Sequence, residues 1–205
     1  MKLKIGILVG VLALVASSAF AGNRPQWIAV NGGAAFPSGD LSDVSGTGWL
    51  AGLTYGIALN DKFAVGADVN YYGFGKKTVD AGIGNADVQP KLWQYTASGY
   101  YMIPMKDKSQ YPYVKIGLGA YSVNPDVTLP AGYTGAPGNK TLFGWNGGLG
   151  WNKVMANKKT SIGLDAAYHW LSQNDEYTKV NSDEKASYSF FTVSAHVGWG
   201  LGGGK

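Results

Sequence analysis

Apolar residues alternate with small or polar residues along most of the chain, and the alternation recurs in eight separate segments. In residues 49–60 the odd positions, from Trp49 to Leu59, are apolar or aromatic, whereas the even positions are mainly small or polar. A period of two places the two sets on opposite faces of a β-strand. The segments with this pattern are residues 26–36, 49–60, 63–71, 93–103, 114–121, 143–151, 162–170 and 191–199. We therefore predict an all-β fold with eight strands.

Long and short connections alternate between the predicted strands. The long connections are rich in Gly, Pro, Asn and Asp and span residues 37–48, 75–90, 124–140 and 172–186. The short connections span residues 60–62, 104–110 and 153–159. Long loops at one end and tight turns at the other are typical of an antiparallel up-and-down barrel in an outer membrane. Because an even number of strands returns the chain to its starting side, the barrel should begin and end at the turn end, which we expect to face the periplasm.

The two faces of the predicted strands differ sharply in charge. Asp68, Lys115 and Asp165 all lie on the face with small and polar residues, and the face with large apolar residues carries essentially no charge. An uncharged apolar surface is unfavourable in water but suits lipid. We therefore predict a transmembrane barrel whose polar face points inward. The alternative is a soluble lipocalin-like barrel with an aromatic core.

Aromatic residues gather near the ends of the predicted strands. They include Trp27, Trp49, Tyr71, Trp93, Trp145, Trp151, Trp170 and Trp199. Aromatic rings with a polar edge favour the level of the lipid headgroups. The sequence thus predicts aromatic girdles at the edges of the apolar band.

Residues 1–21 have the features of a cleavable signal peptide. Two lysines precede an apolar run over residues 5–16, and small residues follow it up to Ala21. This run is shorter than the ~20 residues of a membrane-spanning helix, which argues against a membrane anchor. We predict export through this signal peptide, with the barrel domain over residues 22–205.

The composition excludes several classes of function. The chain has no Cys, which rules out disulfides and thiolate-bound zinc, and its two histidines are too few to indicate a metal site. Arg24 is the one arginine, and the formal net charge falls from +4 to +2 without the two lysines of the signal peptide. That balance does not indicate nucleic-acid binding. We expect no nucleic acid, metal or cofactor as a partner.

The small and polar face supplies the candidate site, a polar cluster in the barrel lumen. Its members are Asp68, Lys115, Asp165, His169 and His196. Eight strands leave an interior just wide enough for side chains to fill, and an unpaired charge there is costly. We expect Lys115 to pair with Asp68, Asp165 or both. We also expect a barrel that is closed to ions and bulky solutes.

A Pro-x-Gly-Asp-Leu hairpin signal follows the first predicted strand. It lies in AFPSGDLS at residues 35–42 and is followed by Thr47-Gly48 and by LTYG at residues 53–56. With these residues and its repeated strand pattern, the chain resembles the outer-membrane β-barrel domain family, which includes small OmpA- and OmpX-like barrels and is related to OmpW-type proteins. The resemblance implies a monomer in the outer membrane of a Gram-negative bacterium. Its surroundings would be outer-membrane lipid and lipopolysaccharide, and the barrel assembly machinery would insert it.

One short sequence hints at catalysis. Lipid A deacylases resemble this fold and carry His-x-Ser in a late strand, where both side chains share a face and can act as base and nucleophile. Here His169 and Ser172 have the spacing His-x-x-Ser, which places them on opposite faces of a strand. The glycines of residues 144–150 match no nucleotide-binding fingerprint, and the acidic residues of 172–186 match no calcium-binding loop. We predict no catalytic, cofactor-binding or metal-binding residues.

Two functions remain open for such a barrel. The first is a structural or surface-interaction role carried by the four long loops, whose partner the sequence does not name. The second is a narrow conduit for small or hydrophobic solutes, as in OmpW-type proteins. A lipid A-modifying enzyme is the third and least favoured hypothesis.

Overall fold

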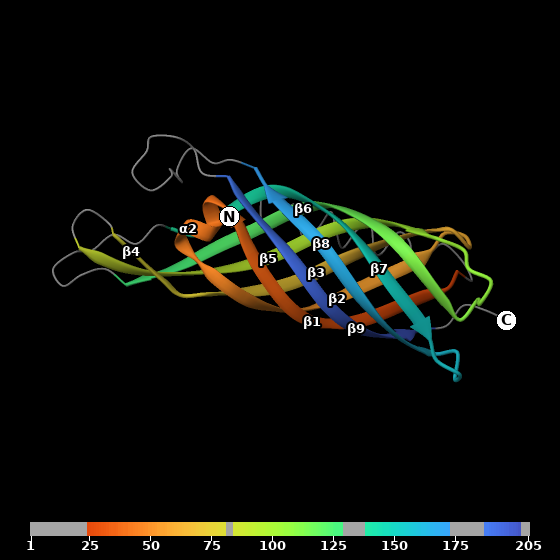
Figure 1. Ribbon diagram of the computed structural model, residues 1–205. Coiled ribbons are helices and arrows are strands. Elements are labelled where there is room, and N and C mark those ends of the chain that lie inside the picture. The colour runs from red at the N-terminus through yellow and green to blue at the C-terminus, as the bar shows by residue number, and fades with distance from the viewer. Residues whose placement is uncertain (1–23, 81–83, 129–137, 173–186, 202–205) are drawn as a thin grey trace.

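The computed structural model describes residues 24–80, 84–128, 138–172 and 187–201, which form a closed antiparallel β-barrel (Figure 1). Its elements are β1 (Gln26–Gly39), α2 (Asp40–Val44), β2 (Gly46–Ala58), β3 (Phe63–Gly75), β4 (Lys77–Asp80), β5 (Asn85–Met102), β6 (Gln110–Thr128), β7 (Lys140–Val154), β8 (Thr160–Leu171) and β9 (Tyr188–Gly200). The sheet runs from β3 through β2, β1, β9, β8, β7 and β6 to β5, and β5 pairs with β3 to close the ring. β4 pairs with β5 beyond the end of β3. Eight strands therefore form the wall, which confirms the predicted fold.

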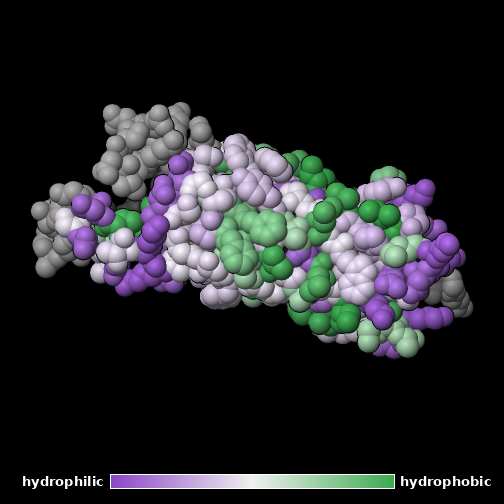
Figure 2. Space-filling model, viewed as in Figure 1, coloured by the Kyte–Doolittle hydropathy of each residue, from purple (hydrophilic) through white to green (hydrophobic). Residues whose placement is uncertain are grey.

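The outward face of the barrel carries the large apolar side chains. Leu118, Leu149 and Leu164 are each more than half exposed, whereas Asp68 in the same wall is completely buried. Figure 2 shows apolar residues over the middle of the barrel and hydrophilic residues toward both ends. Because such a band is favourable against lipid and not against water, the soluble-barrel alternative does not fit this structure.

Two strands extend further than the alternation predicts. β5 begins at Asn85 and β6 ends at Thr128, so both continue into segments that we expected to be loops. Their ladder runs without a shift up to the pair of Asp87 with Thr128. The side chains there no longer alternate between lipid and lumen, because this part of the sheet lies beyond the apolar band. The period-two signal is lost although the backbone pairing continues.

The connection between β1 and β2 contains a short helix that the sequence analysis missed. α2 follows Gly39, whose φ of 55° lies in the left-handed region that glycine adopts most readily. Asp40 and Asp43 lie in its first turn, where carboxylates are favourable. The helix has five residues, too few to show a helical period, and within the described ranges no helix is long and apolar enough to cross a membrane.

Trp27 is an exception to the predicted aromatic girdles. It points into the lumen, where its ring lies edge-on to that of Tyr100, with centroids 6.0 Å apart. It shares the inward parity of β1 with Ala29 and Asn31. Position in the two-residue period, and not aromatic character, therefore decides the side on which this ring lies.

Candidate functional site

Large apolar side chains fill the lumen at the loop end and form a cluster that we call the plug. Its members are Ala35, Leu41, Leu50, Tyr72, Phe74, Leu92, Tyr121, Val123, Leu142, Leu171 and Phe190. The ring of Phe190 lies 4.9 Å from that of Tyr72 and 5.4 Å from that of Phe74. Leu41 joins the plug from α2. Both the barrel wall and the short helix thus contribute to closing this end.

His169 lies in the wall at the edge of the plug that faces the turn end. Its Nδ1 is 3.1 Å from the hydroxyl of Tyr121, and its Nε2 is 3.2 Å from Oγ1 of Thr192. Its ring stacks on Phe190, with centroids 4.4 Å apart. Because both ring nitrogens have protein partners, His169 has no free nitrogen with which to act on Ser172, and no hydrogen bond joins these two described residues.

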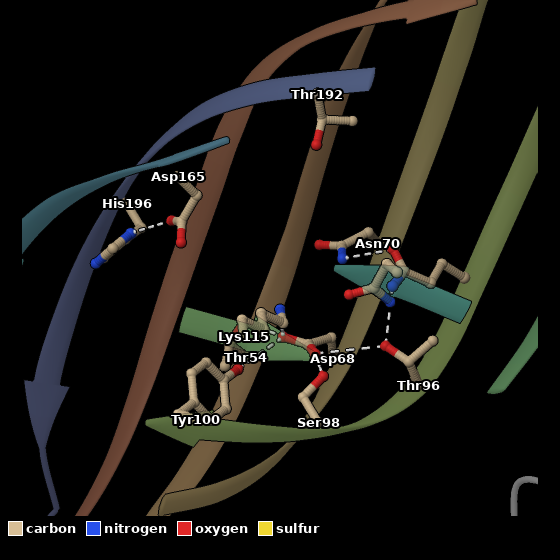
Figure 3. A network of polar contacts seen from close by, with 12 residues as sticks. Thr54, Asp68, Asn70, Thr96, Ser98, Tyr100, Lys115, Asp165, Thr192 and His196 are labelled. Atoms are coloured by element: carbon tan, nitrogen blue, oxygen red, sulfur yellow. Dashed lines mark hydrogen bonds and ion pairs between the residues drawn. The ribbon is translucent and has the colours of Figure 1, made fainter. Parts of the chain in front are cut away.

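Asp68 is the centre of the polar network in the middle of the lumen (Figure 3). Lys115 Nζ lies 2.9 Å from Oδ1, to which Thr54 also donates at 2.7 Å. Ser98 donates to Oδ2 at 2.5 Å, and Thr96 donates to the same oxygen at 3.4 Å. Thr54 and Thr96 are the direct cross-strand neighbours of Asp68 in β2 and β5. A buried carboxylate needs such compensation, since burial of an unpaired charge is strongly unfavourable.

Asp165 and His196 form a second pair, apart from the first (Figure 3). His196 Nδ1 lies 2.6 Å from Asp165 Oδ2, and the Tyr113 hydroxyl donates to Oδ1 of the same carboxylate. No ion pair joins Asp165 to Lys115 in the described part of the chain. Of the two partners that the sequence left open for Lys115, the structure pairs it with Asp68 and leaves Asp165 to His196. The strand parity gave the inward direction of each side chain, but not its height or its angle around the barrel.

Neutral polar residues at inward positions join the charged ones in the lumen. Gln94 donates to Thr96 at 2.9 Å and accepts from Asn70 at 3.0 Å and from the hydroxyl of Tyr72. These residues stand at inward positions of β3 and β5 at similar heights. The parity of their strands predicts that Asn70 and Gln94 point inward, but not the hydrogen bonds between them.

A cavity of about 310 Å³ occupies the part of the lumen toward the turn end. Its lining begins at the turn end, where it includes Lys158 and Lys159, and reaches His169 and the plug residue Tyr72. Asp165, His196 and Lys115 line it between these limits. The lumen is therefore divided into a hollow polar part and a filled apolar part.

The sheet beyond the plug is held by exposed ion pairs. Lys76 Nζ lies 2.5 Å from Asp87 Oδ2, and Lys91 contacts Asp126. The hydrogen bond from Lys76, joined by one from Thr78, holds the pKa of Asp87 below its ordinary value. These contacts tie β4 and β6 to β5 and give the loop end a defined sheet.

Within the described ranges no group of three or more His, Cys, Asp or Glu side chains is placed to hold a metal ion. The residues of the lumen network are satisfied mainly by one another. Their arrangement is that of an internal polar core with a space beside it.

Comparison with known proteins identifies relatives of this chain. It matches, over residues 7–200, the family model described as outer membrane protein beta-barrel domain. A comparison with curated proteins finds no match. The chain is similar to the crystal structure of Neisserial surface protein A, NspA, with 17% identity and a TM-score of 0.54, covering 85% of this chain and 96% of that one.

Two further solved barrels are similar to most of this chain. The N-terminal β-barrel domain of Pseudomonas aeruginosa OprF has 12% identity and a TM-score of 0.50, with coverage of 87% and 99%. Ail, the attachment invasion locus protein of Yersinia pestis, has 13% identity and a TM-score of 0.47, with coverage of 86% and 99%. Because NspA and the OprF domain are less than 25% identical to this chain, their similarity shows a shared fold alone.

Proposed function

Because the chain belongs to the outer membrane protein β-barrel domain family, we propose that it is an integral outer-membrane barrel with a structural or surface-interaction role carried by its long loops. The observation that carries this proposal is the plug. Phe190, Phe74 and Leu41 fill the lumen directly beneath the loops. A partner outside the cell would therefore meet the loops and not the interior.

The loop end offers a rigid platform for such contacts. β5 and β6 pair beyond the apolar band up to Asp87 and Thr128, and β4 is joined to β5 by backbone pairing and by the hydrogen bond from Thr78 to Asp87. α2 is fixed by Leu41 in the plug and by Lys77, whose Nζ donates to the carbonyl of Ser42 at 2.7 Å. Binding residues are often found on loops that a rigid scaffold positions.

The proposal includes the surroundings of the barrel. Outer-membrane lipid and lipopolysaccharide would cover the apolar band, and the barrel assembly machinery would insert a chain exported by its cleaved signal peptide. The four long loops would face outward, and the protein would act as a monomer. The external ligand of the loops is not specified by this proposal.

A conduit for small or hydrophobic solutes is the second candidate, because the cavity of about 310 Å³ occupies part of the lumen. The plug argues against it, since a solute would have to displace Phe190 and its neighbours to pass. We favour a protein without enzymatic activity, because both ring nitrogens of His169 are engaged. Acyl release from labelled lipid A that is lost in His169→Ala would overturn this.

Recording from the purified protein in planar lipid bilayers separates the two candidates. We expect no large, reproducible conductance from the unmodified barrel. A double substitution in the plug, Phe74→Ala with Phe190→Ala, serves as the control that should increase current. Steady current through the unmodified protein would replace the surface-interaction proposal with the conduit.

Trypsin added to intact cells tests the orientation. The cuts should fall in the long loops, such as residues 172–186, and lysines of the turn end, such as Lys106 and Lys158, should be protected. Cleavage at Lys106 or Lys158 in sealed cells would contradict outward-facing loops.

A further inference from the structure

Two neighbouring turns at the turn end of the barrel carry lysines that the chain itself does not neutralise. We call these lysines the lysine rim; all of them are exposed, and they are Lys106, Lys108, Lys153, Lys158 and Lys159. Asp107 is the one carboxylate in residues 103–109 and 153–159. Its oxygens accept hydrogen bonds from Ser109 and Gln110, and within the described ranges no ion pair joins it to a lysine. The rim is therefore a strongly positive surface.

Lysines at the loop end of the same barrel differ from those of the lysine rim. Lys76 and Lys91 form ion pairs with aspartates of β5 and β6. Lys77 donates to the backbone carbonyl of Ser42 at 2.7 Å. Like charges that are held close together repel each other, so a lysine cluster without its own carboxylates is stabilised by anions from outside the chain. The contrast between the two ends indicates an external anion at the rim.

Backbone hydrogen bonds hold the lysine rim in a fixed arrangement. The amide of Val154 donates to the carbonyl of Ser109 at 2.6 Å and so joins the two turns. The carbonyl of Lys159 accepts from the amide of Gly200 at 2.8 Å. The amide of Lys159 donates to Oδ1 of Asn157 at 3.0 Å. These bonds fix the backbone of the turns without using the ammonium groups of the lysines, which stay available to a ligand.

Apolar side chains lie among these lysines and decide which kind of anion fits. Ile103, Met105 and Met155 belong to the same turns and are exposed. Lys153 has the outward parity of β7 and lies opposite Ile162 of β8, an exposed residue at the edge of the apolar band. Figure 2 shows hydrophilic and apolar residues mixed at this end of the barrel. A soluble anion would leave the apolar groups in water, whereas a lipid headgroup region accommodates both kinds of side chain.

We propose that the lysine rim is a binding surface for anionic phospholipids. The ammonium groups contact the headgroup phosphates, and the exposed methionines lie in the adjoining acyl chains. Because the apolar band ends beside the rim, the site continues the contact of the barrel with the bilayer. The proposal rests on the proposed function only for the choice of leaflet, which is the periplasmic one when the loops face outward. The selectivity for lipid is the same in either orientation.

Spin-labelled lipids measure this selectivity directly. The purified protein is reconstituted in phosphatidylcholine vesicles with a trace of spin-labelled phosphatidylglycerol or spin-labelled phosphatidylcholine, and electron paramagnetic resonance gives the fraction of each label that the protein immobilises. Lysines attract anionic lipid, so we expect phosphatidylglycerol to associate about threefold or more strongly. Raising the salt from about 0.1 M to about 1 M shortens the screening length from about 10 Å to about 3 Å and should reduce the preference. Equal association of the two labels would overturn the proposal.

A matched pair of triple variants separates the position of the lysines from the net charge of the protein. The rim variant combines Lys106→Gln, Lys108→Gln and Lys153→Gln. The control variant removes the same charge at the loop end by Lys76→Gln, Lys77→Gln and Lys91→Gln. We expect the rim variant to lose more than half of the preference for phosphatidylglycerol and the control to keep most of it. An equal loss in both variants would assign the preference to net charge and overturn the proposal.

Competition with a free headgroup separates a lipid from a soluble anion. Glycerophosphoglycerol, which has the phosphate but no acyl chains, should not displace spin-labelled phosphatidylglycerol at matched ionic strength. Displacement would show that the apolar side chains have no part in binding and would overturn the lipid site. Heat-modifiable migration on a gel shows whether each variant is folded. If the rim variant does not fold, Lys153→Gln alone and the salt series still test the proposal. Loops that face inward in the trypsin experiment would change the leaflet and leave the selectivity unchanged.

Discussion

The plug and the cavity occupy the same barrel, within walls of the same eight strands, yet one is filled and the other is hollow. At the loop end the inward positions carry large side chains such as Tyr72, Phe74 and Phe190. Toward the turn end the corresponding positions of neighbouring strands include glycines and alanines such as Gly148 and Ala167, beside a few paired charges. The difference teaches that the strand number sets the width of the lumen, whereas side-chain volume at each height decides whether it is filled.

The largest expected effect lies in the plug. Phe190→Ala removes a completely buried ring and should lower the free energy of unfolding by about 3–5 kcal/mol. Reversible urea unfolding in lipid vesicles measures this. The matched control is Phe191→Ala, since Phe191 is the next residue and is 41% exposed on the outward face. A loss as large in the control as in Phe190→Ala would show that the plug is not the tighter region.

The next effect concerns the charge pair beside the cavity. Lys115→Met leaves the buried Asp68 without its cation and should cost about 3 kcal/mol, at the lower end for a broken buried pair. The double variant Lys115→Met with Asp68→Leu should recover part of this loss. Adding Asp165→Leu to Lys115→Met should not, because Asp165 pairs with His196. Recovery of stability with Asp165→Leu in the same unfolding measurement would contradict the pairing of Lys115 with Asp68.

A smaller effect is expected when one neutral donor to Asp68 is removed. Thr54→Val deletes the hydroxyl that donates to Oδ1 at 2.7 Å and should cost about 1.5 kcal/mol, since hydrogen bonds to charged groups contribute about 1.5–3 kcal/mol. Thr54→Ser keeps the donor and should retain most of the stability. If valine and serine are equivalent in the unfolding midpoint, the hydroxyl has no energetic role.

The smallest effect lies outside the barrel, at the loop-end sheet. The pKa of Asp87 lies below its ordinary value of 3.8 because Lys76 and Thr78 donate to its carboxylate. The contact therefore stabilises the pairing of β4 with β5 above the ordinary pKa, and this is lost as the pH falls through the lowered value. Amide hydrogen exchange in residues 77–80 should accelerate in Asp87→Asn relative to the parent near neutral pH. Unchanged exchange would mean that backbone pairing alone holds this edge.

The sequence predicted the parts of this structure that depend on a period of two. All eight wall strands, the outward position of Leu118 and the inward position of Asp68 follow from alternation between two environments. The same rule, applied without regard to residue type, would have placed Trp27 inside. An assumed preference of tryptophan for the membrane interface outweighed the parity of its strand, and the prediction was wrong there.

Other features depend on information that the alternation does not contain. Lys115 pairs with Asp68 and not with Asp165 because of strand register and ring closure. These set the height of each side chain in the lumen and its angle around the barrel. α2 is too short to show a period, and the pairing of β5 with β6 continues where neither face contacts lipid. The plug could be predicted only by knowing which inward residues of the eight strands lie at the same height in the barrel.

The pairing of β1 with β9 also governs how the chain reaches its folded state. Gln26–Gly39 and Tyr188–Gly200 stand at opposite ends of the described sequence, yet their ladder runs from Trp27 opposite Gly200 to Gly39 opposite Tyr188. Every other pair of neighbouring strands in the wall can form as a hairpin or local meander. The seam between β1 and β9, in contrast, cannot form until nearly the whole chain is present. Non-local pairings of this kind slow folding because loop-closure entropy is lost before contacts compensate for it. Until the seam forms, two strand edges present unpaired backbone groups, which hydrocarbon does not tolerate. Insertion into the bilayer and ring closure are thus expected to be one concerted event.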